Sequence, residues 1–349
     1  MDYSCVENEF REVLYWKPRG NGIFGRILFF LLLAGGLFTF LKIQPILLSQ
    51  NSALPVYGKI EEASKSSVKD SITLPTLNQD KDKRTNILLI GMAGKPWPSP
   101  YLTDSLQIVS ASSDFQDISA IAVPRDLLVK ISGSKKEARI NSLYSISKDP
   151  SLLIKKLKEI TGLKIQYYIV IDLKTLEKVV NIFGGVDVNV KEKIYDPAFP
   201  TVSRGYEAFS INAGGQHLDG ATAIKYIRSR HQARGDFGRV ERQQQVMEVL
   251  QMKVIKLKLF SDFKEITALF REFKGKTNFT LKDLRILTGL AKSTKDREIK
   301  YLLIDAGKPN SLLLYGETYL GGKKASVLWP KAGKFNYAGI KAKINSLLK

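Results

Sequence analysis

The chain has 349 residues, 44% of them hydrophobic and 25% charged, a balance typical of a globular protein with one or two well-buried domains. Its single cysteine, Cys5, excludes an intrachain disulfide, and its two histidines are too few for a histidine-rich zinc site. The formal net charge of +20 favours a polyanionic partner, whether nucleic acid, anionic lipid or a phosphate-rich polymer.

The first predicted element is a helix that crosses a membrane. Ile27–Leu41 contains no charged residue, and apolar residues on both sides extend the run to 23–48. Basic residues precede the run and are absent from 43–58, so the positive-inside rule places the N-terminus in the cytoplasm. We therefore expect a cytoplasmic tail over 1–22, a transmembrane signal anchor over 23–48 and an extracytoplasmic remainder. A cleaved signal peptide is the alternative, but the leader is long and lacks a clear A-x-A cleavage site.

Strands and helices are predicted to alternate after a polar, extracytoplasmic linker over 49–85. The five predicted strands are Asn86–Met92, Ser105–Ala111, Asp117–Val123, Gln166–Leu173 and Val186–Val190. Amphipathic helices are predicted over Pro150–Leu163 and Lys174–Gly185. This order predicts an α/β sandwich with helices on both faces of a central sheet.

Residues 261–349 are expected to form either the last layer of the same fold or a small appended α/β extension. They contain helical segments, predicted strands at Tyr301–Ala306 and Ser326–Pro330, and a last helix over about 336–348.

An unusual density of arginine marks the segment Tyr226–Met247, YIRSRHQARGDFGRVERQQQVM, which holds five arginines against two acids. Arg228 and Arg230 are two residues apart, so in an extended stretch their side chains share one side and can hold the same anion. Guanidinium groups suit the oxygens of a diphosphate. The alternative, a set of solvated surface ion pairs, lacks nearby acids, because only Asp236 and Glu241 lie within the segment.

The second half of this segment is a predicted helix over 237–259 with Asp236 as its N-cap. Arg239 and Gln243 fall on the face whose later residues are aliphatic and pack on the core, with Arg242 at the edge of that face. An unpaired buried arginine is costly, so we expect an internal carboxylate or a bound anion there. The free N–H groups of a helix N-terminus also favour phosphate.

Two aspartates stand at the ends of predicted strands. Asp104 directly precedes the second strand, and Asp126 follows the third. If those strands are neighbours, both acids lie at one edge of the sheet, where sites of α/β proteins form, and Arg125 and Arg139 add cations. Phosphoryl transfer usually employs Mg²⁺ held by one or two carboxylates, whereas each aspartate taken alone is more typical of a turn cap.

These motifs together resemble the LytR–CpsA–Psr family of cell-envelope phosphotransferases. In the family's order they are NILLIG (Asn86–Gly91), TDSLQIV (Thr103–Val109), AVPRD (Ala122–Asp126), RIN (Arg139–Asn141), FGGVDV (Phe183–Val188) and HLDGATAIKYIRSRHQARGDFGRVERQQQVM (His217–Met247). The last motif is long and specific, and the others are individually weak. The chain departs from the family in lacking the hydroxyls that often flank the PRD triplet and the Gly-Gly turn that often follows RIN.

The resemblance implies an α/β/α sandwich around a central mixed sheet, with a catalytic domain over 86–260. It implies Mg²⁺-dependent transfer of a phosphate-linked glycan polymer from a polyprenyl-pyrophosphate carrier to a hydroxyl of peptidoglycan or another cell-wall acceptor. The expected location is the bacterial cell membrane, with a single pass, membrane lipid as a partner and no nucleic acid. The alternatives are a polyprenyl-pyrophosphate hydrolase and a non-enzymatic, membrane-tethered polyanion-binding or regulatory protein.

The resemblance also implies roles for individual residues. Asp104 and Asp126 match the metal-associated acids. The residues that match pyrophosphate binders are Arg125, Arg139, Arg228, Arg230, Arg239 and Gln243. The expected catalytic residues are Asp104, Asp126, Arg125, Arg228, Arg230 and Asp236, the last as a base or as an orienting group.

Overall fold

The computed structural model describes residues 77–203, 205–229, 235–255, 263–280, 283, 299–307 and 309–349. The predicted membrane segment and most of the predicted linker lie outside these residues. Within the described residues, no helix combines the length and the apolar character that a membrane span requires.

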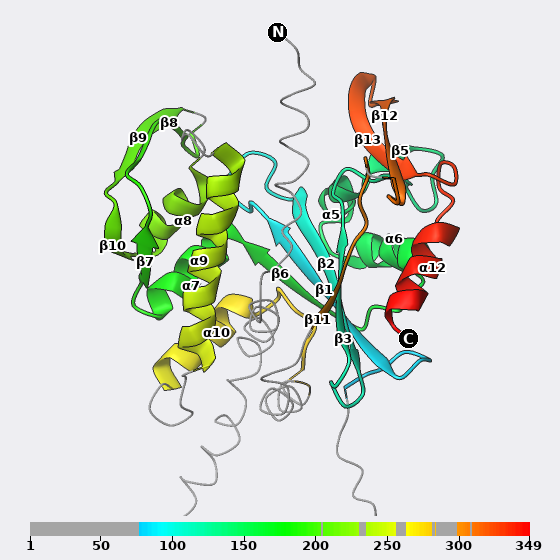
Figure 1. The fold of residues 1–349 in the computed structure, drawn as a ribbon, viewed down its shortest axis with the longest axis horizontal. Helices are drawn as coiled ribbons and strands as arrows, with labels where there is room; N and C mark the ends of the chain where they lie inside the picture. Colours follow the sequence, from blue (N-terminus) through cyan, green and yellow to red (C-terminus); the bar gives the residue numbers. More distant parts are fainter. Residues whose placement is uncertain are drawn as a thin grey trace, which may run out of the picture.

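A five-stranded mixed sheet in the order β11-β3-β2-β1-β6 forms the centre of the molecule (Figure 1). Its strands are β1 (Arg84–Met92), β2 (Thr103–Ser112), β3 (Ile118–Val123), β6 (Tyr167–Asp172) and β11 (Ile299–Leu303). The β1–β2 and β2–β3 pairs are antiparallel, whereas β1–β6 and β3–β11 are parallel. Ile87 and Leu89 of β1 face one hydrophobic core and Leu88 and Ile90 face another, so the sheet is buried on both sides.

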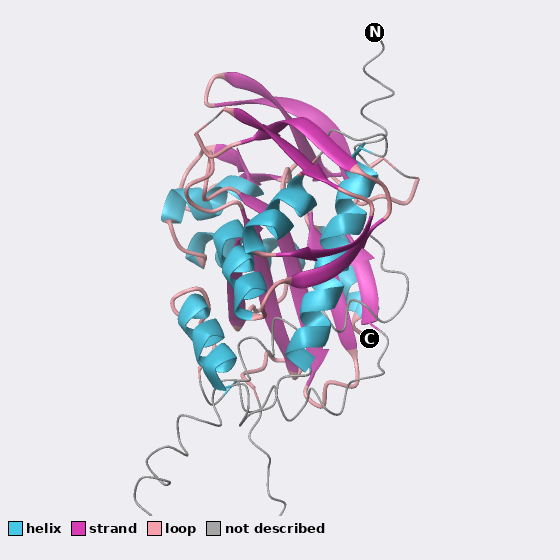
Figure 2. Cartoon of the chain, turned by 90° about the vertical axis from the view of Figure 1, so that its left-hand side faces the viewer, coloured by secondary structure: helices cyan, strands magenta, loops and turns pink. Residues whose placement is uncertain are grey.

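Helices cover both faces of this sheet (Figures 1 and 2). The helices on one face are α7 (Leu173–Ile182), α8 (Gly220–Arg228), α9 (Gly235–Ile255) and α10 (Phe263–Phe273). Those on the other face are α5 (Leu143–Ser147), α6 (Ser151–Thr161) and α12 (Ala338–Leu347). The expected α/β/α sandwich around a central mixed sheet is therefore confirmed, and β11 shows that residues beyond 260 form one edge of that sheet.

Two-stranded antiparallel sheets extend the sandwich. They pair β4 (Leu128–Lys130) with β5 (Glu137–Arg139), β7 (Val186–Val190) with β10 (Gly214–Leu218), β8 (Ile194–Pro200) with β9 (Tyr206–Ile211), and β12 (Leu313–Leu320) with β13 (Lys323–Pro330). The predictions missed most of these strands, because they are short or carry prolines, as β8 does. The predicted strand Ser326–Pro330 is the second half of β13, whereas β11 begins two residues before the predicted Tyr301.

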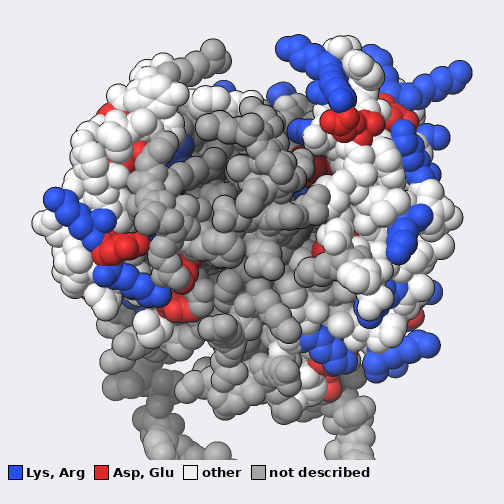
Figure 3. Space-filling view, turned by 45° about the horizontal axis from the view of Figure 1, so that its top comes forward, with Lys and Arg blue, Asp and Glu red and all other residues white. Residues whose placement is uncertain are grey.

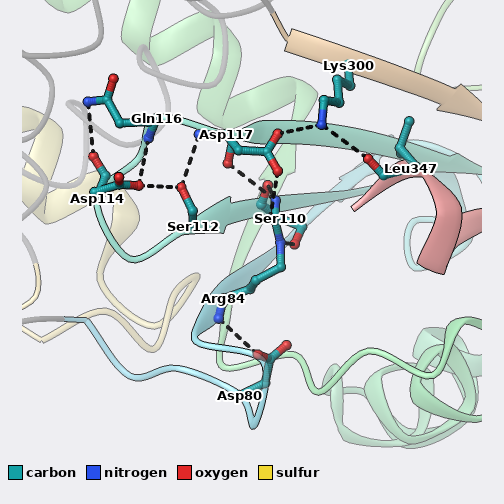
Figure 4. Close-up of polar contacts among 9 residues, drawn as sticks. All are labelled: Asp80, Arg84, Ser110, Ser112, Asp114, Gln116, Asp117, Lys300 and Leu347. Atoms are coloured by element: carbon teal, nitrogen blue, oxygen red, sulfur yellow. Dashed lines mark hydrogen bonds and ion pairs between the residues drawn. The ribbon is translucent and has the colours of Figure 1, made fainter. Parts of the chain in front are cut away.

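The N-terminal boundary of the ordered domain also differs from the prediction. We expected the polar linker to reach 85, but β1 begins at Arg84 and Leu77 is already buried. The Arg84 side chain is only 8% exposed because it binds across the sheet (Figure 4). Its Nη1 pairs with Asp117 Oδ2 at 2.8 Å, and its Nε donates to Ser110 Oγ at 2.8 Å.

This network joins four strands at the end of the sheet where β1 begins. Arg84 lies on β1, Ser110 on β2 and Asp117 just before β3. Lys300 of β11 completes it, with its Nζ 3.2 Å from Asp117 Oδ1. Because the groups are charged and sheltered, the network is expected to stabilise the sheet more than a surface ion pair would.

We predict that Arg84→Met lowers the free energy of unfolding by about 2 kcal/mol, because it removes charge-assisted hydrogen bonds from Asp117 and Ser110. Lys324→Met is the matched control. Lys324 pairs with Glu317 at 2.6 Å, but both side chains are more than half exposed, so a change within about 0.5 kcal/mol is expected. Urea denaturation followed by circular dichroism measures both, and equal losses in the two variants would contradict the assignment.

Candidate functional site

The two predicted acids lie at the same edge of the sheet. Antiparallel pairing of β2 with β3 sets Leu106 opposite Val123, so the start of β2 meets the end of β3. Asp104 is the second residue of β2, and Asp126 lies three residues beyond β3. Arg125 connects them, because its Nη1 donates to Asp104 Oδ1 at 2.8 Å and its Nε lies 3.7 Å from Asp126 Oδ2.

A fourth charge continues this arrangement on the other side of Asp126. Arg139 Nε lies 3.4 Å from Asp126 Oδ1, so Asp104, Arg125, Asp126 and Arg139 alternate in sign. We call these four residues the charge row. Their side chains are 53%, 40%, 32% and 34% exposed, respectively. Side chains this accessible can exchange their internal partners for a bound anion or a cation.

The backbone around the charge row comes from four separate segments. Asn141 of the 3₁₀ helix η1 (Ile140–Ser142) donates its backbone N–H to the Arg125 carbonyl at 3.2 Å. The Thr103 hydroxyl donates to the Asn141 carbonyl at 3.4 Å. The motifs TDSLQIV, AVPRD and RIN therefore meet, although they are well separated in the sequence.

The C-terminal hairpin is the fourth of these segments; sequence reasoning predicted its strand Ser326–Pro330 but not its contact with the site. In β13, Leu328 donates its backbone N–H to the Asp126 carbonyl at 3.0 Å. Arg139 donates from Nε and Nη2 to the Ser326 carbonyl, at 3.0 and 2.6 Å. Because Ser326 and Leu328 act here through backbone groups, no side-chain pattern in the sequence signals their contribution.

Arg228 belongs to the same end of the molecule through the loop that joins β1 to β2. It is the last residue of α8, and its guanidinium carbon lies 3.6 Å from the centre of the Trp97 ring. The same guanidinium carbon lies 5.2 Å from the centre of the Phe199 ring. These are cation–π contacts, and they hold the guanidinium against the loop that leads to Asp104.

Trp97 is fixed within a tight loop that the sequence analysis did not assign. Gly94 accepts the Trp97 backbone N–H at 3.0 Å and donates its own to the Pro100 carbonyl at 3.0 Å. Gly94 has φ +75° and passes so close to Asp172 that a Cβ would lie 2.5 Å from the aspartate Cβ, so only glycine fits. The sequence signal for this loop was a tryptophan between prolines shortly before the motif TDSLQIV.

The helix that carries Arg228 is held at its start by a charged cap. Asp219, the N-cap of α8, accepts the Thr222 backbone N–H at 2.8 Å. The hydrogen bond to the Thr222 side chain, together with that to its backbone, lowers the pKa of the Asp219 carboxyl. The Asp219 carboxylate therefore stays charged at a lower pH than an ordinary aspartate would. Its negative charge at the N-terminus of α8 interacts favourably with the helix dipole.

Other predicted site residues fall wholly or partly outside the described residues. This holds for Arg230 and for the side chains of Asp236 and Arg239. The helix itself begins at Gly235, so the prediction of Asp236 as N-cap is wrong and Asp236 lies in the first turn. A carboxylate in the first turn of a helix still interacts favourably with the helix dipole.

The predicted phase of α9 also needs correction. Arg242, expected at the edge, is 6% exposed, whereas Gln243 is exposed. Arg242 precedes the buried Val246 and Leu250 at intervals of four residues, which places it on the core-facing stripe. Its Nε donates to the Tyr226 carbonyl at 2.7 Å, so the partner of the inward guanidinium is the end of α8. Gln243 also reaches α8, through a 3.3 Å hydrogen bond to a backbone carbonyl.

The described residues of this site offer two carboxylates to a metal, Asp104 and Asp126. Within the described part of the chain, no cluster of three or more His, Cys, Asp or Glu side chains could hold a metal. Asp104 and Asp126 nevertheless offer hard carboxylate oxygens on either side of Arg125. Mg²⁺ fits such a pair when water and phosphate oxygens complete its coordination.

Known proteins share both this fold and this sequence pattern. The structure of Bacillus subtilis TagV superposes with a TM-score of 0.52 at 22% identity, covering 77% of this chain and 98% of TagV. In sequence, Regulatory protein MsrR of Staphylococcus aureus is 30% identical over 227 residues, which are 64% of this chain and 65% of MsrR. The polyisoprenyl-teichoic acid–peptidoglycan teichoic acid transferase TagU of Bacillus mycoides is 28% identical over 213 residues, 61% of this chain and 66% of TagU.

The matched region thus spans just under two thirds of each of these two relatives. The family match extends further, because the model of the LytR_cpsA_psr family covers residues 46–329. That range includes the charge row, the arginine segment and most of the C-terminal hairpin. The chain therefore belongs to the LytR–CpsA–Psr family.

Proposed function

We propose that the protein transfers a phosphate-linked glycan polymer from a polyprenyl-pyrophosphate carrier to a hydroxyl of peptidoglycan or another cell-wall acceptor. The observation that carries this proposal is the charge row, which sets two carboxylates between two arginines at one edge of the sheet. Family membership supports it, as does the similarity to TagU, whose name describes transfer of teichoic acid to peptidoglycan.

Arginines of the charge row and of the arginine segment would bind the pyrophosphate of the donor. Arg125 and Arg139 are accessible and already pair with carboxylates, so phosphate oxygens can replace those partners. Arg228 contacts the β1–β2 loop through the ring of Trp97. The remaining proposed binders are Arg230, Arg239 and Gln243. Gln243 keeps a second amide N–H for a ligand besides the one that it gives to Ile227.

Asp104 and Asp126 would hold Mg²⁺ together with water and donor phosphate oxygens. When bound, the ion would neutralise charge on the pyrophosphate. The carboxylates would then give up their ion pairs with Arg125 and Arg139, which frees both guanidinium groups for the phosphates. This exchange couples metal binding to donor binding through the residues of the charge row alone.

The reaction forms a bond between the acceptor oxygen and the sugar-linked phosphorus and breaks the bridging P–O bond. Polyprenyl phosphate leaves with the bridging oxygen, and the arginines stabilise the charge that develops on both phosphates. The acceptor proton passes to a base, and Asp236 in the first turn of α9 is the candidate for that base or for an orienting group. A single N-terminal membrane anchor would keep this extracytoplasmic site beside its lipid-linked donor.

Positive charge elsewhere on this face suits an anionic polymer. Figure 3 brings the site end forward and shows Lys and Arg side chains along the right, over the side that carries β12 and β13. Lys323 and Lys324 at the hairpin turn are exposed. Together with the net charge of +20, these cations favour a glycan-phosphate chain as substrate.

We predict that Arg228→Ala lowers kcat/KM for glycan transfer by more than about tenfold while leaving the melting temperature nearly unchanged, because a sheltered charge-assisted contact to phosphate is lost. Lys225→Ala is the control on the same helix. Lys225 already pairs with Glu207 at 2.8 Å in a partly exposed ion pair, and transfer is expected to stay within about twofold. If Arg228→Ala instead melts much lower and keeps full activity per folded molecule, Arg228 is structural.

Metal dependence gives a second test. Asp104→Asn and Asp126→Asn should each raise the Mg²⁺ concentration for half-maximal transfer by about tenfold, the equivalent of about 1.4 kcal/mol. EDTA should lower the melting temperature of the parent more than that of Asp104→Asn, because only the parent gains stability from the ion. Asp114→Asn, in the exposed β2–β3 turn at the opposite end of the sheet, is the control. An unchanged Mg²⁺ requirement in both site variants would remove these acids from the metal site.

A further inference from the structure

Ser229 lies within the arginine segment, directly after the last residue of α8, and it is completely buried. Its backbone leaves the helix with φ −57° and ψ 139°, so this residue sets the direction in which the chain continues after Arg228. Its backbone N–H donates to the Lys225 carbonyl at 2.9 Å, and its hydroxyl donates to Asp196 Oδ2 at 2.9 Å. Ser229 is therefore fixed both along the helix and across to β8.

Asp196 is a buried carboxylate whose contacts converge on this segment. The residue is 0% exposed in β8, and its Oδ1 also accepts the Ala198 backbone N–H at 3.3 Å. Burying a carboxylate is costly unless its hydrogen bonds are satisfied, so a polar residue here needs a reason beyond packing. Phe199, three residues further along β8, lies against the Arg228 guanidinium at 5.2 Å. One short strand thus contacts both Arg228 and its neighbour Ser229.

Arg242 holds the same segment from the opposite side. Its Nε donates to the Tyr226 carbonyl and its Nη2 to the Ser229 carbonyl, at 2.7 and 2.5 Å. Carbonyls in the last turn of a helix lack intrahelical partners, and a cation at this end also favours the helix dipole. The buried guanidinium therefore closes α8 at the place where the phosphate-binding arginines begin.

We propose that Asp196 and Arg242 are positioning residues that clamp Ser229 and thereby set the place of the Arg228 guanidinium. The role in donor binding rests on the proposed function, whereas the clamp itself rests only on the contacts of Ser229. Phosphate recognition by guanidinium groups is sensitive to displacements of about 1 Å, which makes a rigid anchor beside Arg228 consequential. Loss of the clamp should weaken phosphate binding without removing any phosphate-binding side chain.

The environment of Trp97 can be measured directly, and it would not change if Asp196 only stabilised the fold. The chain contains three tryptophans, Trp16, Trp97 and Trp329, and of the two that the structure describes, Trp97 is the one against the Arg228 guanidinium. In the full chain labelled with 5-fluorotryptophan, Trp97→Phe assigns the Trp97 fluorine resonance, and Arg228→Ala defines its shift when the guanidinium is removed. Asp196→Asn and the milder Ser229→Ala should each shift this resonance in the same direction as Arg228→Ala.

Asp187→Asn is the matched control, because Asp187 of β7 is an exposed carboxylate that pairs with His217 on the adjacent strand β10. It should leave the Trp97 resonance in place. The double variant Asp196→Asn/Ser229→Ala should be no worse than the worse single variant, because both remove the same hydrogen bond. Additive shifts, or a Trp97 resonance that Asp196→Asn and Ser229→Ala leave unmoved, would overturn the clamp.

Binding of inorganic pyrophosphate separates this proposal from the proposed function. We expect its dissociation constant to rise about tenfold in Arg228→Ala and several-fold in Ser229→Ala. Ser229→Ala is also expected to melt below the parent, because Asp196 loses a buried hydrogen bond, so all affinities are compared at a temperature at which each variant is folded. If Arg228→Ala weakens pyrophosphate binding but Asp196→Asn and Ser229→Ala do not, the clamp is wrong and the binding site stands. If the Trp97 resonance shifts as expected while no variant changes pyrophosphate affinity, the clamp stands and the proposed function fails.

Discussion

The ion pair between Arg125 and Asp104 is the interaction on which the candidate site depends. It exists because β2 and β3 run antiparallel in a register that brings the start of one to the end of the other. Both faces of the central sheet are buried, so polar chemistry is confined to the strand ends and the loops that leave them. Asp126 and Arg139 extend the pair into a row of four charges that alternate in sign, whose accessible side chains can exchange their internal partners for an anion and a cation.

Two peripheral elements complete this edge from opposite sides. The β12–β13 hairpin supplies backbone groups that hold Asp126 and Arg139, so residues far beyond the arginine segment help to build the site. The helix α9 supplies Arg242, which binds the end of α8 and leaves Arg228 to contact Trp97. Charged side chains thus act in two ways here, with accessible ones available to a ligand and buried ones fixing the segments that carry them.

Sequence reasoning found the strands of the sheet because their signals are local. A strand buried on both faces, such as β1, is a continuous apolar run in the sequence. Asp104 and Asp126 were recognisable because they stand next to such runs. Of the strands in the two-stranded sheets, only β7 and part of β13 were predicted; most of the others are short, and β8 contains two prolines. The sequence predicted that Gln243 faces the core, whereas in the structure Arg242 does. The core-facing stripe continues at intervals of four residues, and near the edge of that stripe a helical projection does not separate two neighbouring residues. The contribution of Ser326 is a backbone carbonyl, which no side-chain pattern encodes.

The most direct test of the proposed transfer follows the sugar-linked phosphate. The purified full chain is incubated with Mg²⁺, peptidoglycan fragments and a polyprenyl-pyrophosphate-linked glycan whose sugar-linked phosphate is radiolabelled. The account predicts that the label appears in a phosphodiester on the acceptor, together with an equal amount of unlabelled polyprenyl phosphate, and that omitting the acceptor abolishes both products. Release of labelled glycan phosphate into water at the same rate with and without acceptor would contradict the account and identify a hydrolase.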